Sequence, residues 1–157
     1  MKFGKKSKIS LEIAGADNAS DYLLLEKLVG GKTYAALASE KEFLEEIKKA
    51  TVYFFKNKDE IIGHITYRLN KNGSVHLGGF AIDPKYQGQG FGRKAMETIL
   101  DLAKNAPKID LVTHPDNLKA ISLYQSFGFK ITEQKENYYG DGEPRVILVW
   151  TSGKIAS

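Results

Sequence analysis

The spacing of apolar residues along the chain predicts an alternation of strands and helices. Helices are indicated where apolar residues recur every three to four positions, as at Met96, Ile99, Leu100 and Ala103. Strands are indicated by short apolar runs that turn residues bound. We expect strands at 9–15, 51–55, 61–69, 74–83, 108–114, 129–134 and 145–150, and helices at 21–29, 39–50, 92–104 and 117–127.

The ends of these helices carry recognisable signals. Ser20 is the expected cap of the first helix, which the glycine pair 30–31 ends. Ser39 and Glu42 have the spacing of a capping box, in which each side chain bonds the backbone of the other residue. Gly128 is expected to stop the last helix.

The order β-α-α-β-β-β-α-β-α-β-β limits the topology. Polar turns after residues 55 and 69 predict three consecutive antiparallel strands, and the helix at 92–104 is expected to cross over between parallel neighbours. We therefore expect one α/β (α+β) domain over 9–152, with a mixed sheet covered by helices. The flanking segments 1–8 and 153–157 are expected to be tails.

Composition excludes several classes of protein. The chain has no cysteine, so it has neither a disulfide nor a thiolate metal site, and the three histidines (His64, His76 and His114) lack metal-ligand spacing. No apolar run is long enough to cross a bilayer and no secretory signal is evident, so we expect a cytoplasmic protein without a membrane partner. The net charge of +4 equals the four lysines of residues 1–8, which argues against nucleic acid as the partner.

The stretch YQGQGFGRKAM (86–96) places three glycines between an expected strand and an expected helix. Free N–H groups and the positive end of a helix make such a position an anion site. A dinucleotide fingerprint would need glycine where Arg93 stands, and the spacing of a P-loop is absent. Arg93 and Lys94 lie in the first helical turn, where a bound phosphate would offset their unfavourable position, although two solvated side chains fit the residues equally well.

Two motifs resemble the GCN5-related N-acetyltransferase (GNAT) family. QGQGFG (87–92) is similar to the Q/R-x-x-G-x-G/A signature that binds a pyrophosphate, and NLKAISLYQSFGF (117–129) is similar to the helix N-x-x-A-x-x-L-Y-x-x-x-G-F. The resemblance extends in element order over residues 9–150, and it implies a seven-stranded, mostly antiparallel sheet that is splayed at the cofactor site and flanked by about four helices.

The resemblance also implies a cofactor, acetyl-CoA as acetyl donor, and no metal. The backbone from Gly88 through Gln89, Gly90, Phe91 and Gly92 to Arg93 would hold the pyrophosphate, with Gln87 before it. The pantetheine arm would lie along Phe80, Ala81 and Ile82, where the pair Gly78-Gly79 suggests either a β-bulge or a packing constraint. The N–H of Phe80 would donate to the thioester carbonyl, and Asn117 would contact the cofactor.

The resemblance implies that Tyr124 is the general acid, since a phenol stays protonated at neutral pH and can protonate a leaving thiolate. Similar ribosomal-protein alanine acetyltransferases carry a glutamate base where Val112 stands here, so the base is unassigned among His76, His114 and a water chain.

The acceptor is also open. ENYYGDGEPR (136–145) resembles the tyrosine loop of protein N-terminal acetyltransferases, although Pro144 stands where those enzymes more often carry an acid. We expect direct transfer to a primary amine, either a peptide N-terminus or a small molecule. The alternative is a non-catalytic acyl-CoA-binding or regulatory module on the same fold.

Overall fold

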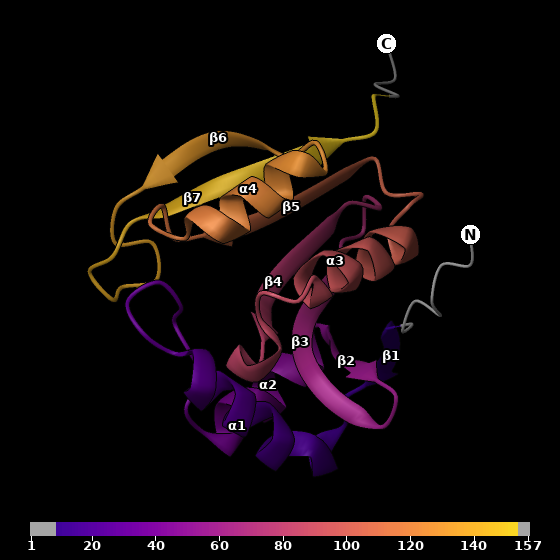
Figure 1. Ribbon diagram of the computed structural model, residues 1–157. Coiled ribbons are helices and arrows are strands. Elements are labelled where there is room, and N and C mark those ends of the chain that lie inside the picture. Colours follow the sequence, from indigo (N-terminus) through magenta and orange to yellow (C-terminus); the bar gives the residue numbers. More distant parts are fainter. Residues whose placement is uncertain (1–8, 154–157) are drawn as a thin grey trace.

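A computed structural model of the chain describes residues 9–153. Seven strands form one mixed sheet in the order β1-β2-β3-β4-β5-β7-β6, and four α-helices cover it (Figure 1). The strands are β1 (Ile9–Ile13), β2 (Thr51–Asn57), β3 (Glu60–Leu69), β4 (Val75–Ile82), β5 (Lys108–Thr113), β6 (Lys130–Lys135) and β7 (Arg145–Thr151). The helices are α1 (Ala19–Val29), α2 (Glu40–Lys49), α3 (Phe91–Leu102) and α4 (Leu118–Ser126), with 3-10 turns η1 (Ala16–Asn18) and η2 (Pro84–Tyr86).

This architecture confirms the expected fold class, the element order and the parallel pairing on either side of the α3 crossover. The predicted cap of the first helix is wrong. The 3-10 turn η1 runs directly into α1, so the helix begins at Ala19 and Ser20 lies inside it. Asn18 closes that turn by accepting a hydrogen bond from the Gly15 N–H. The expected tails, 1–8 and most of 153–157, lie outside the described residues.

The two faces of the sheet carry separate cores. Neighbouring residues of a strand point to opposite faces, and on β2 Phe54 packs with α1 and α2 whereas Phe55 belongs to the core beneath α3 and α4. Phe43 of α2 is fully buried in the first of these cores, and Met96 and Ile99 of α3 are fully buried in the second. Helices α1 and α2 therefore cover one face of the sheet, and α3 and α4 cover the other (Figure 1).

The middle of the sheet is interrupted at β4. Pairing with β3 shifts register opposite Ile65, because Gly79 and Phe80 stand where one residue would fit. Gly79 has φ +55, a conformation that favours glycine, so the predicted bulge is present. On its other edge β4 pairs with β5 only through Val75, His76 and Leu77. Beyond Leu77 the two strands diverge, and the expected splay of the sheet lies there (Figure 1).

Candidate functional site

The glycine turn connects η2 to the N-terminus of α3. Gly88 and Gly90 have φ +77 and +83, which side chains rarely tolerate, and a Cβ at either position would meet no protein atom within 4 Å. The side-chain amides of Gln87 and Gln89 donate to the carbonyls of Ile82 and Lys85, at 2.9 and 3.0 Å, and so hold the turn in place. The first backbone bond at the start of α3 runs from the Lys94 N–H to the Gly90 carbonyl at 3.2 Å, so the N–H groups before it are not used within the helix, as an anion site requires.

A cavity of about 1060 Å³ begins at this turn and reaches both faces of the sheet. Its walls include Gly92 and Met96 from α3 on one face and Glu42 and Glu46 from α2 on the other. The cavity therefore passes through the gap between β4 and β5. Eight of the predicted residues line it: Phe80, Ala81, Ile82, Gln87, Gly88, Gly92, Asn117 and Tyr124.

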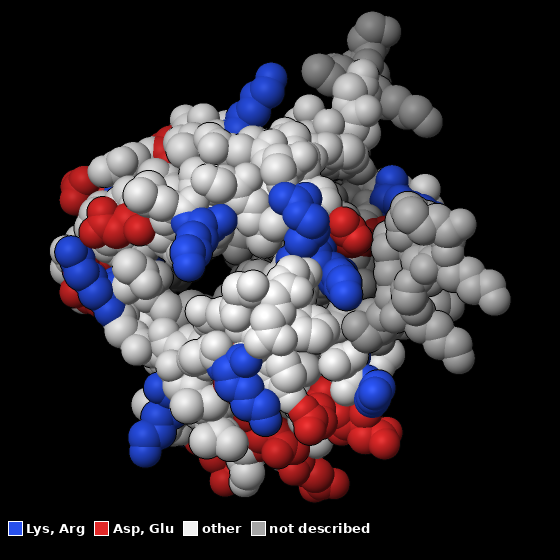
Figure 2. Space-filling view, in the orientation of Figure 1, with Lys and Arg blue, Asp and Glu red and all other residues white. Residues whose placement is uncertain are grey.

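The remaining predicted residues, Gln89, Gly90, Phe91 and Arg93, belong to the same turn but do not line this cavity. Arg93 instead donates to Ser126 Oγ on α4 at 3.0 Å and stacks over Phe127. With Lys119 it borders a smaller hollow of about 440 Å³. Figure 2 shows lysine or arginine side chains beside a hollow on the face that carries α3 and α4. This face therefore offers positive charge next to the glycine turn.

Tyr124 lies on α4 with its ring in the core and 5% of the residue exposed. It contacts Phe80 edge-on, with ring centroids 6.4 Å apart, and borders the cavity beside the bulge. Burial raises its pKa, so the phenol is protonated at neutral pH and able to donate a proton. The ring thus packs in the core and borders the cavity, so a sequence-based assignment to core packing alone describes only part of its position.

Asn117 occupies the N-cap position of α4 but does not cap it through its side chain. Its amide nitrogen donates instead to Thr113 Oγ1 at the end of β5, at 3.2 Å. This contact turns the residue toward the splayed end of β5, where it borders the cavity.

A buried polar cluster lies on the α1 and α2 face and was not predicted from the sequence. Glu26 Oε1 accepts hydrogen bonds from the Tyr22 hydroxyl and the Leu37 N–H, at 3.2 and 3.0 Å, and Oε2 lies 3.2 Å from His64 Nε2. Burial acts to raise the pKa of Glu26, but the contacts with His64, the Tyr34 hydroxyl and the Leu37 N–H together outweigh it, and the net pKa is lowered.

Tyr34 lies between this cluster and the bulge at Gly79. Its hydroxyl lies 3.5 Å from the position that a Cβ on Gly79 would take, and the residue lines the cavity. Burial, followed by the nearby Glu26 carboxylate, raises the pKa of Tyr34, so it also stays protonated. The segment that carries it, between α1 and α2, has no regular periodicity, and no local sequence signal indicates that it reaches β4.

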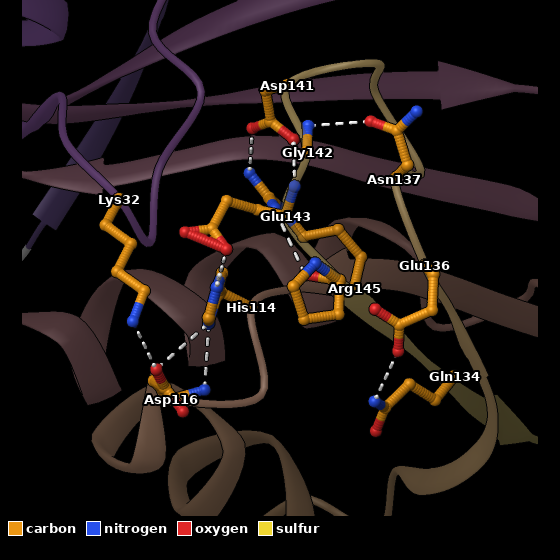
Figure 3. A network of polar contacts seen from close by, with 11 residues as sticks. Lys32, His114, Asp116, Gln134, Glu136, Asn137, Asp141, Gly142, Glu143 and Arg145 are labelled. Carbon is orange, nitrogen blue, oxygen red and sulfur yellow. Dashed lines mark hydrogen bonds and ion pairs between the residues drawn. The ribbon is translucent and has the colours of Figure 1, made fainter.

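The two histidines that the sequence left open as bases differ in position. His76 lines the cavity and bonds Asp110 through Nδ1, whereas His114 does not line it. His114 Nδ1 accepts from the Asp116 N–H at 3.0 Å, and Nε2 lies 3.6 Å from Glu143 (Figure 3). His114 thus joins two loops. Val112, where the resemblance would place a glutamate, lines the cavity as an apolar residue.

Three loops meet at the splayed end of the sheet. Lys32, after α1, forms a 3.2 Å ion pair with Asp116, before α4, and so joins the two halves of the molecule (Figures 1 and 3). In the expected tyrosine loop it is Tyr139 that lines the cavity, beneath the stacked guanidinium of Arg145. Tyr138 packs edge-on against Tyr139 and is 38% exposed.

Residues 9–153 contain neither a metal-binding cluster nor a helix that could span a membrane. Within residues 9–153, no group of three or more His, Asp or Glu side chains is arranged to hold a metal ion. No helix of the described chain combines the length and apolar character that spanning a bilayer demands.

Comparisons with known proteins agree on one family. A family model described as Acetyltransferase (GNAT) family matches residues 21–129. A spermine/spermidine N(1)-acetyltransferase of Bacillus subtilis is 30% identical over 135 residues, covering 78% of this chain and 89% of the relative. The [ribosomal protein bS18]-alanine N-acetyltransferase of Escherichia coli is 35% identical over 103 residues, covering 55% and 70%. A crystal structure of a GNAT family acetyltransferase from Elizabethkingia anophelis with acetyl-CoA bound superposes with a TM-score of 0.73, at 22% identity, covering 93% of this chain and 99% of that one.

Proposed function

This chain belongs to the acetyltransferase (GNAT) family, and we propose that it transfers the acetyl group of acetyl-CoA directly to a primary amine while both substrates are bound. One observation carries the proposal: a single cavity connects the glycine turn, Tyr124 and the β4 bulge with the opposite face of the sheet. The donor and the acceptor can therefore meet inside the gap without a covalent enzyme intermediate.

The cofactor is held by the α3 side in this proposal. The N–H groups from Gly88 to Arg93 receive the pyrophosphate, for which the free first turn of α3 and the open space before Gly88 and Gly90 provide room. Gln87 keeps the turn in shape, Asn117 borders the arm of the cofactor, and Arg93 contributes a cation nearby. The pantetheine arm pairs with the free edge of β4 along Phe80, Ala81 and Ile82.

Chemistry takes place at the bulge. The N–H of Phe80 donates to the thioester carbonyl, whose oxygen becomes negative as the amine adds, and this stabilises the transition state more than the ground state. Tyr124 gives its proton to the departing thiolate. Since its raised pKa keeps the phenol protonated, the acid is ready over the whole neutral pH range.

We propose a small amine as the first acceptor to test. The Lys32–Asp116 ion pair joins the loops on either side of the acceptor region, which leaves less room for an extended peptide. The relative that matches the larger share of this chain is named for spermine and spermidine. Charge does not favour a cationic acceptor, because the cavity walls carry Lys49, Arg68, Lys119 and Arg145 beside Glu26, Glu42 and Glu46.

A CoA-release assay tests the function. Purified protein with acetyl-CoA is offered polyamines, amino acids and peptides with free N-termini, and turnover with at least one primary amine is expected. Tight binding of acetyl-CoA without any turnover would support the non-catalytic module instead. Failure to bind coenzyme A in calorimetry would contradict both.

A further inference from the structure

His76 and Asp110 form a pair at the point where the sheet begins to open. They are direct partners in the short parallel ladder between β4 and β5, and His76 Nδ1 bonds Asp110 Oδ1. Their neighbours Leu77 and Leu111 point into the core beneath α3, so the pair points to the opposite face, from which the acceptor arrives.

The second ring nitrogen of His76, Nε2, lies beside Gly78, the residue before the bulge. His76 lies among the lining residues with 27% of its side chain exposed, and Nε2 is 3.7 Å from the position of a Cβ on Gly78. Because Nδ1 is engaged by a carboxylate, the proton of a neutral ring belongs on Nδ1 and Nε2 keeps a free lone pair. The geometry thus presents a proton acceptor directly next to the bulge.

We propose that His76 is the general base of the acetyl transfer, with Asp110 as the residue that positions its ring. This inference rests on the proposed N-acetyltransferase function. The acceptor ammonium gives one proton to Nε2, and the free amine forms a C–N bond to the acetyl carbon. The C–S bond then breaks, and the leaving thiolate takes the proton of Tyr124. The second proton of the amine returns to the Tyr124 oxygen. The products are the amide, coenzyme A and one proton, which His76 passes to solvent.

The other two histidines and the Glu26 carboxylate are less suitable as the base. His64 is fully buried, stacked on Tyr22 and directed at Glu26, and it does not line the cavity. His114 accepts a hydrogen bond from the Asp116 N–H and does not line the cavity. The Glu26 carboxylate accepts from Tyr22 and Leu37 through Oε1, and its Oε2 lies 3.2 Å from His64 Nε2. His76 therefore combines access with a free lone pair. Val112, where similar enzymes carry a glutamate, lies two residues beyond Asp110 on the same face of β5.

The charges around His76 explain why a carboxylate is needed behind it. Arg68 on β3 is its cross-strand partner, and Lys49, Glu46 and Arg145 border the same cavity. A guanidinium beside the ring opposes the imidazolium that forms during the reaction. Asp110 offsets that repulsion and fixes the ring orientation at the same time.

The test compares variants with the best amine found in the CoA-release assay. His76→Gln should lower kcat/KM at pH 7 by about 10²- to 10⁴-fold, the usual worth of a positioned base. Asp110→Asn should cost about 10- to 100-fold, as loss of a partner that orients an imidazole does. The double variant should be no worse than His76→Gln. Asp101→Asn, an exposed position on α3, is the matched control and should keep wild-type activity.

The pH profile separates a base from a structural residue. Wild-type kcat/KM should fall in acid, as it does for any reaction that requires an unprotonated base. The loss of kcat/KM in His76→Gln relative to the wild type should shrink by up to about tenfold per pH unit above neutrality. The reason is that an acceptor amine with a pKa near 10 increasingly loses its proton to water and then needs no base. Calorimetry should find the same affinity for coenzyme A in both proteins.

A spectrum of the wild-type protein adds a readout that needs no active variant. Long-range ¹H–¹⁵N correlations, assigned with His76→Gln, should identify the tautomer with the proton on Nδ1. A proton on Nε2 at neutral pH, or wild-type rates and pH profile in His76→Gln while Tyr124→Phe is impaired, would overturn the assignment. Absence of turnover in the wild type would instead refute the enzyme function on which it rests.

Discussion

The two faces of the central sheet are built from residues at very different separations in the sequence. On the α3 and α4 face, the glycine turn and the Tyr124 helix are each one continuous stretch. On the α1 and α2 face, the cavity wall combines Tyr34 from a loop with His76 and Arg145 from two strands. The face that would hold a cofactor is thus encoded locally, whereas the acceptor face depends on the tertiary fold. Local motifs are readable in a single sequence, whereas contacts between distant segments are not.

The largest kinetic effect is expected at Tyr124, which borders the cavity that connects the two faces. Tyr124→Phe should lower kcat by about 10²- to 10⁴-fold, because the thiolate must then leave without a positioned acid. Affinity for acetyl-CoA should stay within a factor of two or three, a spread ordinary for a neutral change. Pre-steady-state kinetics and calorimetry measure the two quantities. Tyr67→Phe, outside the cavity, is the control, and an unchanged kcat in Tyr124→Phe would favour a binding module.

The cofactor face should respond to backbone geometry. Replacing both Gly88 and Gly90 by Ala forces residues with side chains into the left-handed region, at about 1 kcal/mol or more for each. The turn then changes shape, and the dissociation constant for coenzyme A should rise by about 10- to 100-fold, since the N–H groups no longer converge. Gly73→Ala carries the same strain at φ +85 in the turn before β4 and should leave affinity unaffected. Equal affinities in both variants would contradict a role of the glycine turn in binding.

Removing the buried charge of Glu26 on the α1 and α2 face should lower the free energy of unfolding more at neutral pH than in acid. The pKa of Glu26 is lowered in the folded protein, so its contribution is present above the ordinary carboxyl pKa and is lost as pH falls through the lowered value. Glu26→Gln keeps an acceptor for Leu37 but removes the charge beside His64. It should cost about 1–3 kcal/mol at neutral pH and less below pH 4. Urea unfolding at both pH values measures this, with the exposed Glu97→Gln as control. A constant difference across pH would assign the cost to packing.

The smallest effect is expected at the contact between the two halves. Lys32 and Asp116 are 64% and 61% exposed, so Lys32→Ala should change the free energy of unfolding by less than about 1 kcal/mol. Its effect on the acceptor KM should be a few-fold and should disappear at high salt, which screens such pairs. Steady-state kinetics with the best amine at two salt concentrations, beside the exposed Lys27→Ala, decide this. A salt-independent KM would place the acceptor away from these loops.

Much of the fold follows from the sequence because each element carries its own pattern. The predicted cap at Ser39 formed, with Ser39 Oγ accepting from the Glu42 N–H at 3.1 Å, but the Glu42 carboxylate accepts from the Ala38 N–H and the Ser39 hydroxyl instead of the Ser39 N–H. Gly79 produced the expected bulge, and Gly128 follows the end of α4. The cap at Ser20 failed because serine also fits inside a helix, and the preceding 3-10 turn supplied a better start.

The site was predictable only where one segment carries it. Tyr124 and the glycine turn lie within motifs, and the structure brings them to one cavity. The pairing of His76 with Asp110 spans 34 residues and depends on the register between two strands, which no local spacing fixes. The contact of Glu26 with His64 likewise requires α1 to lie on one particular face of β3.

The short ladder between β4 and β5 has a consequence for how the rate can be tuned. Three residue pairs set the angle at which the strands separate, and hence the width available to two molecules that must approach within bonding distance. Val75 and Ile109, which are 1% and 2% exposed, fix that angle from inside the core without lining the cavity. A change of volume at these hidden positions should therefore alter how the strands separate, and with it the rate, without removing any residue that lines the cavity.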